Sequence, residues 1–219
     1  MPEAGFQRAR SADAKRLREA SILEAAQRLG AERGIREVTL SEIADAVGMH
    51  KSALLRYFET REEIFLRLTA EGWREWSGAL RTELGRLAKP TPGAIAALLA
   101  GTLAARGAFC DLLAQAPLNL ERNVSVGAVR VFKLAVHAEL DTIVAAIQTL
   151  LPTMVDSDAV DLIATATSLS GAFWQMATPG AEIAALYRSD PQLHHAVVDV
   201  EVRVQRILTA LIDGLLSPT

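Results

Sequence analysis

Apolar residues recur every three or four positions in the first part of the chain. In residues 14–33 this repeat predicts one helix, which we expect to end at Gly34. Thr39 and Glu42 have the T-x-x-E spacing of a capping box, which predicts the start of a second helix. A third helix is predicted over residues 51–58. Because the second and third helices are short, they must be held in place by packing on their neighbours.

The third helix separates apolar from polar side chains, and Gly48 stands between it and the second helix. We expect its inner face to carry Leu54, Leu55 and Phe58. Its outer face then carries the polar residues of the segment, namely Lys51, Ser52, Arg56 and Tyr57. Two short helices joined by a glycine turn, with a polar outer face on the second, are typical of a helix-turn-helix that enters the DNA major groove.

From Arg61 onward the helical spacing continues, and no alternation of the β kind interrupts it. The sequence KPTPG at residues 89–93 is the clearest break, because two prolines and a glycine cannot continue a helix. The helices predicted in this part of the chain cover residues 61–89, 94–106, 109–116, 124–151, 157–177, 181–188 and 191–216. The predicted fold class is therefore all-α.

Two of these helices have the alternating three and four spacing of coiled coils. The two seams consist of Leu162, Ala166, Leu169 and Phe173 on one helix and Val197, Val200, Val204, Ile207 and Leu211 on the other. Two such seams from each of two chains would form a four-helix bundle, and we predict this bundle as the interface of a homodimer. The alternative is that both seams face the core of their own chain.

Charge is unevenly distributed along the chain, although the net charge is only −3. Residues 1–18 carry five basic and two acidic side chains, whereas residues 71–219 carry 11 basic and 15 acidic ones. This distribution predicts a basic N-terminal part on an acidic body. The segment from Arg8 to Arg18 is either an arm that reaches the DNA or a disordered solubilising tail.

The sequence favours a cytoplasmic protein that does not enter a membrane. Cys110 is the single cysteine, so no internal disulfide can form, and the first residues lack the apolar core of a signal sequence. The longest uncharged run, residues 162–181, holds several hydroxyl side chains and a Pro-Gly break, which argue against a membrane span.

The segment ILEAAQRLGAERGIREVTLSEIADAVGMHKSALLRYFETREEIF, at residues 22–65, resembles the DNA-binding domain of the TetR family of bacterial transcription regulators. The resemblance depends on I-L-x-A-A in the first helix, I-A-x-x-x-G in the second, and Y-F before a basic residue. It implies a helix-turn-helix domain over residues 14–70 and a helical effector-binding and dimerisation domain over residues 71–219. It also implies a homodimeric repressor of a palindromic DNA operator that a small molecule releases.

Carried over residue by residue, the resemblance implies two groups of DNA contacts. Contacts at or near base edges are implied for Ser41, His50, Lys51 and Ser52. Phosphate contacts are implied for Thr39, Tyr57 and Arg61. The chemistry agrees, since Lys51 can donate to guanine, while Arg56 and Arg61 can neutralise phosphates. Leu55 stands where the family usually has a phosphate-contacting tyrosine, which puts that contact in doubt.

Each of these residues could instead be an ordinary solvated side chain, and His50 could simply help to start the third helix. For the effector, which we expect to be largely apolar, the candidate contacts are apolar or aromatic side chains with a few polar groups among them. These candidates are Phe109, Cys110, Phe132, His137, Met154, Trp174, Gln175 and Met176. Each of them could equally be part of the core or of the interface.

Enzymatic function finds little support in the sequence, and we expect no cofactor and no metal. The chain contains no H-E-x-x-H, no G-x-S-x-G and no glycine-rich phosphate loop after a strand. His194 and His195 are adjacent and would point to different sides of a helix. Two rival interpretations are a helical enzyme that uses His137 or Cys110, and a helical protein-interaction module without specific DNA binding.

Overall fold

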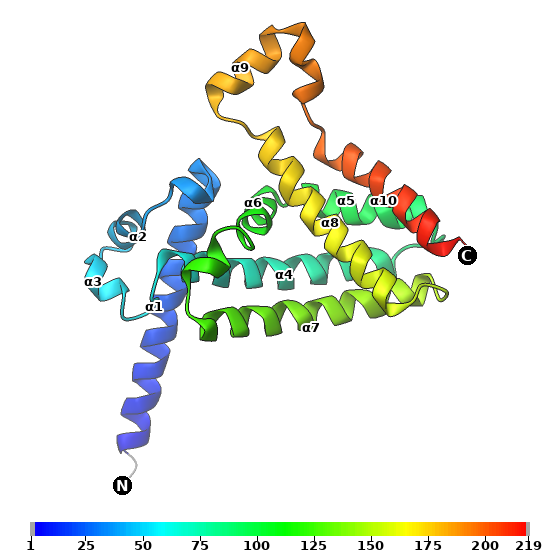
Figure 1. Ribbon diagram of the computed structural model, residues 1–219. Coiled ribbons are helices and arrows are strands. Elements are labelled where there is room, and N and C mark those ends of the chain that lie inside the picture. Colours follow the sequence, from blue (N-terminus) through cyan, green and yellow to red (C-terminus); the bar gives the residue numbers. More distant parts are fainter. Residues whose placement is uncertain (1–2, 218–219) are drawn as a thin grey trace.

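The computed structural model describes the backbone of residues 3–217 and the side chains of residues 13–193 and 197–217. Within this part of the chain every regular element is a helix, which confirms the predicted all-α fold (Figure 1). In chain order the elements are α1 (Glu3–Arg33), η1 (Ile35–Glu37), α2 (Leu40–Ala46), α3 (Lys51–Leu54), α4 (Arg61–Gly85), α5 (Pro92–Ala104), α6 (Gly107–Gln115), η2 (Leu120–Asn123), α7 (Val126–Leu150), α8 (Asp156–Ala177), α9 (Ala181–Ser189), η3 (Pro191–Ala196) and α10 (Val200–Leu216). Among the helices described here, none is by itself both long and apolar enough to cross a membrane.

We call residues 14–70 the head and residues 71–217 the body. In the head, α2 packs on α1 and on α3, and α1 packs on α4 (Figure 1). The residues that join these helices are fully buried and include Ile22, Ala26, Ile43, Leu54 and Phe65. Because α4 passes from the head into the body without a break, the position of the domain boundary remains a prediction.

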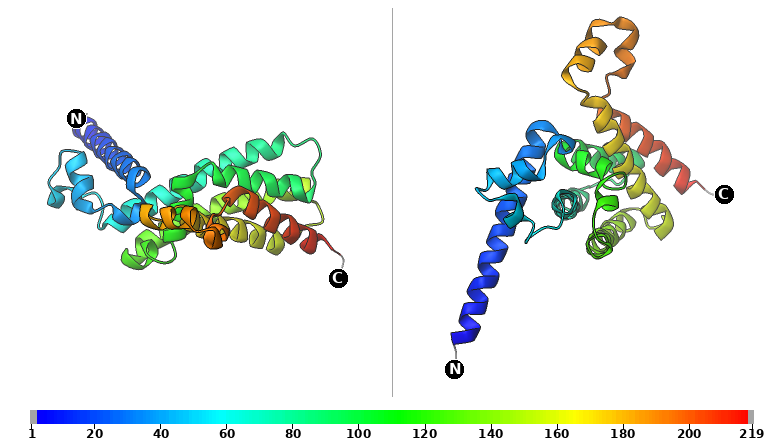
Figure 2. Two further views of the ribbon diagram at one scale, coloured as in Figure 1. Left: turned by 90° about the horizontal axis from the view of Figure 1, so that it is seen from above. Right: turned by 60° about the vertical axis from the view of Figure 1, so that its left-hand side comes forward.

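The first helix begins at Glu3, earlier than the sequence pattern predicts, and its first half extends away from the rest of the molecule (Figure 2). Lys15 and Glu19 form an ion pair of 3.7 Å along this half. The N-terminal segment is thus helical in the structure. The side chains of Arg8 and Arg10 lie outside the described residues.

Threonine side chains cap the N-terminal ends of three helices, α2, α4 and α5. The predicted capping box is confirmed: the hydroxyl of Thr39 accepts from the backbone N–H of Glu42, and the Glu42 carboxylate accepts from the N–H of Thr39. Thr60 caps α4 and Thr91 caps α5 in the same way, each with its side-chain oxygen. Each cap satisfies a backbone donor that lacks a helical partner, and so fixes where its helix begins.

The core of the body centres on three aromatic side chains from α4 and α6. Trp73 lies edge-on to Trp76, with ring centroids 5.4 Å apart, and edge-on to Phe109 at 6.0 Å. The indole N–H of Trp76 donates to the hydroxyl of Thr102 on α5 at 3.0 Å, so this buried polar group is satisfied. Around this cluster α5 and α8 pack against α10, and α7 packs along α4.

The last predicted helix, residues 191–216, is divided in the structure. α9 and η3 pack on each other and extend beyond the body, and α10 begins only at Val200 (Figure 1). Asp199 caps α10 by accepting from the N–H of Val202, which explains this start. Val197 therefore lies outside α10 and is 62% exposed, so its predicted place in a helical seam is wrong.

The two predicted seams turn partly into the chain's own core. Leu162, Ala166, Val200 and Val204 are buried between α8, α10 and their neighbours within one chain. Side chains with almost no exposed surface cannot contact a second chain, so for these four residues the dimer prediction is corrected. The same spacing serves internal packing, because α8 and α10 also cross each other in the monomer. The remaining seam residues are half-buried: Leu169, Phe173, Ile207 and Leu211.

The close crossing of α8 and α6 depends on Gly171. A Cβ atom at this position would lie 3.0 Å from the backbone nitrogen of Ala114, on α6. We therefore predict that Gly171→Ala lowers the free energy of unfolding by about 1 to 3 kcal/mol through overpacking. Gly78, in the middle of α4, has no atom within 4 Å of such a Cβ.

Gly78→Ala is thus a matched control, and it should raise the free energy of unfolding by about 0.5 to 1 kcal/mol through helix propensity. Urea titration of both variants, followed by circular dichroism, measures the two values. If Gly171→Ala raised the free energy of unfolding as much as Gly78→Ala does, the tight crossing of α8 and α6 would be contradicted.

Candidate nucleic-acid interface

The link between α2 and α3 forms the tight turn of a helix-turn-helix. α2 ends at Ala46, and Gly48 follows with a φ of 63°, a conformation that glycine adopts without strain. The N–H of Met49 donates to the carbonyl of Ala44 at 2.9 Å, which closes the turn. As a result α3 lies at the outer edge of the head, far from the body (Figures 1 and 2).

The α-helical part of α3 is shorter than predicted and covers Lys51–Leu54. Beyond it the turn tightens, because the N–H of Tyr57 donates to the carbonyl of Leu54 at 2.8 Å, three residues earlier. A tighter turn places residue i+3 directly over residue i. Tyr57 is therefore half-buried against the core, although we predicted it to point outward, and Leu54 beneath it is fully buried.

Leu55 shows the opposite change. We predicted it on the inner face, but its side chain is 44% exposed. Leu54 and Phe58 occupy the core contacts of this segment, and the turn that joins the N–H of Leu55 to the carbonyl of Lys51 places Leu55 on the outer side with Lys51.

The outer surface of α3 is polar and carries positive charge. Its exposed polar residues are Lys51, Ser52 and Arg56. Within the described part of the chain neither Lys51 nor Arg56 forms an ion pair, and residues 50–58 contain no acid. Such a surface suits the phosphates and base edges of DNA. Ser41, at the start of α2, is also exposed.

His50 acts as the cap of α3. Its Nδ1 atom accepts from the backbone N–H of Ser52 at 3.4 Å and lies 2.9 Å from the hydroxyl of Ser52. The alternative that His50 helps to start the third helix is thus confirmed. Its ring is exposed beside Lys51, so the base contact implied for His50 remains a prediction.

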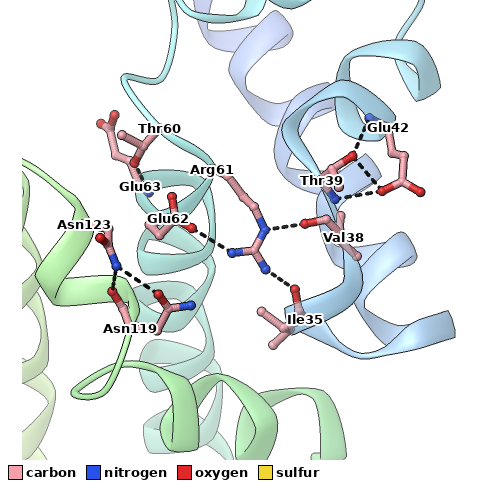
Figure 3. A network of polar contacts seen from close by, with 10 residues as sticks. All are labelled: Ile35, Val38, Thr39, Glu42, Thr60, Arg61, Glu62, Glu63, Asn119 and Asn123. Atoms are coloured by element: carbon pink, nitrogen blue, oxygen red, sulfur yellow. Dashed lines mark hydrogen bonds and ion pairs between the residues drawn. The ribbon is translucent and has the colours of Figure 1, made fainter.

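Thr39 and Glu42 form a second exposed polar group of the head (Figure 3). The guanidinium of Arg33 donates to Glu42 at 2.7 Å, and Thr39 donates to it through both its N–H and its hydroxyl. These hydrogen bonds, with that of Arg33 the strongest, lower the pKa of Glu42 to about 2. Glu42 is therefore ionised at neutral pH and ties the start of α2 to the end of α1.

Arg61 has a structural role in the head, and the phosphate contact implied for it remains a prediction. Its Nε donates to the carbonyl of Val38, its Nη2 donates to the carbonyl of Ile35, and its Nη1 pairs with Glu62 at 2.9 Å (Figure 3). The guanidinium also lies over the ring of Phe65, and the side chain is only 13% exposed. The guanidinium faces the link between α1 and α2, and each of its three nitrogens donates to a group of the head.

The eight candidate effector residues do not gather in one pocket. Four of them are buried in the core of the body: Phe109, Cys110, Phe132 and Met154. Burial raises the pKa of the Cys110 thiol to about 12, which keeps it protonated and unreactive. His137 is 71% exposed and pairs with Asp141 at 3.0 Å, and Met176 is also exposed, so neither fits an enclosed pocket. The side chains of His194 and His195 lie outside the described residues.

Trp174 and Gln175 line a cavity of about 750 Å³ between head and body. Its other walls come from the end of α1, from η1 and from α6. Asp111 of α6 connects the walls: one carboxylate oxygen accepts from the N–H of Ile35 at 2.9 Å, and the other accepts from Gln175 at 2.8 Å. Sequence reasoning missed Asp111, although a lone acid between apolar residues of a short helix was a signal that it has a buried partner.

The chain matches two adjoining family models. Residues 22–68 match the model described as bacterial regulatory proteins of the tetR family, and residues 70–219 match the model of the tetracyclin repressor-like C-terminal domain. The chain belongs to the TetR family. A search of curated protein sequences found no match for this TetR-family chain.

Solved structures of other regulators have the same fold at low identity. The FadR regulator from Bacillus subtilis in complex with stearoyl-CoA is 15% identical, with a TM-score of 0.58 over 89% of this chain and 98% of that one. RolR in complex with resorcinol is also 15% identical, with a TM-score of 0.53 over 94% and 90%. PfmR from Thermus thermophilus is 16% identical, with a TM-score of 0.55 over 90% and 99%.

Arg61 should matter for stability, in contrast to the exposed arginine of α3. We predict that Arg61→Ala lowers the free energy of unfolding by about 2 to 4 kcal/mol, because two carbonyl groups each lose a hydrogen bond from the guanidinium. Arg56→Ala should change it by less than about 0.5 kcal/mol, as expected of a surface residue. Thermal and urea unfolding without DNA measure both variants, and equal stabilities would refute the structural role of Arg61.

Proposed function

We propose that this TetR-family chain is a transcription regulator that represses genes by occupying a palindromic DNA operator as a homodimer, and that a small-molecule effector releases it. The observation that carries this proposal is the outer surface of α3. It presents Lys51, Ser52 and Arg56 on a narrow helix at the far edge of the head, in a segment, residues 50–58, that contains no acid. Such a helix fits the major groove, where Lys51 can reach guanine and Arg56 the adjacent phosphates.

Around α3, Ser41 and Thr39 at the start of α2 are exposed and suit backbone contacts, and His50 and Ser52 lie where base edges would be read. Tyr57 is half-buried, so its hydroxyl is the part of the ring suited to a phosphate. The acidic body would be repelled by DNA, which favours binding through the head alone. A regulator of this kind works in the cytoplasm.

The homodimer is supported by what α8 and α10 leave on the surface. Small side chains follow one side of α8, at Ala164, Ser168 and Ala172, and all three are exposed. α10 exposes Ala210 and Gly214 next to half-buried apolar residues. Small residues allow a second pair of helices to approach closely, and the half-buried residues Leu169, Phe173, Ile207 and Leu211 would then complete a four-helix contact.

A dimer is needed because each operator half-site lies one helical turn from the next, about 34 to 36 Å away. An effector that changes the separation of the two heads would release the DNA. The structural relatives in complex with stearoyl-CoA and resorcinol support a small, largely apolar effector. The cavity beside Trp174 and Gln175 is large enough for such a molecule, and Asp111 would pass its effect on to the head.

DNA binding can be tested at Lys51. We predict that Lys51→Ala weakens binding to the operator, once selected from random DNA, by about 1 to 3 kcal/mol, and weakens binding to random DNA less. Lys89→Ala, which removes an exposed lysine of the body, should change neither value. Fluorescence anisotropy at several salt concentrations gives both affinities.

Several phosphate contacts require a steep fall of affinity with salt. Affinity that does not depend on salt would favour the rival interpretation, a protein-interaction module. Equal losses of Lys51→Ala on operator and random DNA would reduce Lys51 to a phosphate contact.

The dimer can be tested on the exposed side of α8. We predict that the wild-type chain sediments as a dimer at micromolar concentration and that Ala164→Arg sediments as a monomer, because a buried unpaired charge opposes the contact. Ala145→Arg, at an exposed position of α7, is the matched control and should remain dimeric. A monomeric wild type would exclude the dimer. If Ala164→Arg and Ala145→Arg were both dimeric, the interface would lie elsewhere.

A further inference from the structure

Leu55 is an exposed apolar residue within the polar surface proposed to read DNA. Its backbone N–H donates to the carbonyl of Lys51 at 3.2 Å, so the two residues lie one turn apart on the same side of α3. Leu54 and Phe58, on the opposite side, are buried and hold the helix in this rotation. Leu55 therefore cannot turn into the core without displacing one of them.

The chemistry of a leucine side chain limits what it can contact in DNA. It has no donor and no acceptor, so it can hold neither a phosphate nor the polar edge of a base. In the major groove the apolar group available to it is the C5 methyl of thymine, which distinguishes T·A from the other pairs. Contact with that methyl group would remove apolar surface of Leu55 from water, which is favourable. A polar base edge offers the leucine side chain no such gain.

We propose that Leu55 contacts the C5 methyl group of one thymine in each operator half-site and thereby specifies a T·A pair. The inference rests on the proposed DNA-binding function and adds a specificity-determining residue to it. One turn of helix spans about 5.4 Å, and successive base pairs are about 3.4 Å apart. The thymine should thus lie within about two base pairs of the pair that Lys51 reads.

Replacement of thymine by deoxyuridine tests the contact, because it removes only the methyl group. The operator is first selected from random DNA with the full chain, and each thymine is then replaced symmetrically in both half-sites. For the wild type we expect one position at which the affinity falls about fourfold per half-site, or about 15-fold for the symmetric change. For Leu55→Ala, thymine and deoxyuridine should bind equally at that position.

Two further variants control for indirect effects. Leu118→Ala removes another exposed leucine, on the body, and should keep the full preference for thymine. Leu55→Met keeps an apolar side chain of similar length and should keep most of it. Thermal unfolding of Leu55→Ala should match the wild type, since the side chain is not part of the core.

A wild-type scan in which no thymine prefers its methyl group would overturn the inference while DNA binding stands. A preference that Leu55→Ala retains would also overturn it. Failure of the chain to select any DNA sequence would instead overturn the proposed function, and Leu55 with it.

Discussion

The geometry of the head depends on how Arg61 holds the link between α1 and α2. The carbonyl groups of Ile35 and Val38 lie in this link, and both accept from the same guanidinium. Because Arg61 is the first residue of α4, these bonds fix the start of α2 to the rod that enters the body. α2 and α3 are too short to be stable alone. The position of α3 relative to α4 is therefore set by the side chain of Arg61 and by the buried core of the head.

The same link is tied to the body from its other side. The carbonyl of Ile35 accepts from Arg61 of the head, and its N–H donates to the carboxylate of Asp111 on α6. Gln175 of α8 donates to the other oxygen of that carboxylate and orients it. A displacement of α6 or α8 would thus act on the residue that positions α2. The rod of α4 supplies a second, covalent connection. With two connections, a movement of the body relative to α4 would tilt the head, which is what release from DNA requires in the proposed mechanism.

The sequence pattern missed the division of residues 191–216 into η3 and α10. It was sufficient for most other helices, for the helix-turn-helix and for the cap of α2, because periodicity and capping are local properties. The capping box at Thr39 is an example. It was insufficient wherever the partner is distant in sequence. The structural role of Arg61 was missed because its partners, two backbone carbonyls, leave no mark in the sequence. Tyr57 turns inward because the tightened turn after Leu54 changes the helical period from 3.6 to about 3. Leu55 faces outward because it lies one regular turn after Lys51. The partners of Asp111 could be identified only once α6 was placed beside the head.

The charge of the molecule limits how strongly one head alone can hold DNA. The outer surface of α3 carries two cations, Lys51 and Arg56, whereas Arg61 lies in the head and donates to the carbonyl groups of Ile35 and Val38. The acidic body adds repulsion. Because non-specific affinity rises with the number of phosphates neutralised, an α3 surface with two cations contributes little binding on its own. Two linked heads bind DNA more tightly than one, because the first contact raises the effective concentration of the second head. This gain in affinity exists only while the separation of the heads matches the spacing of the grooves. Weak single heads therefore make a modest change in separation sufficient for release.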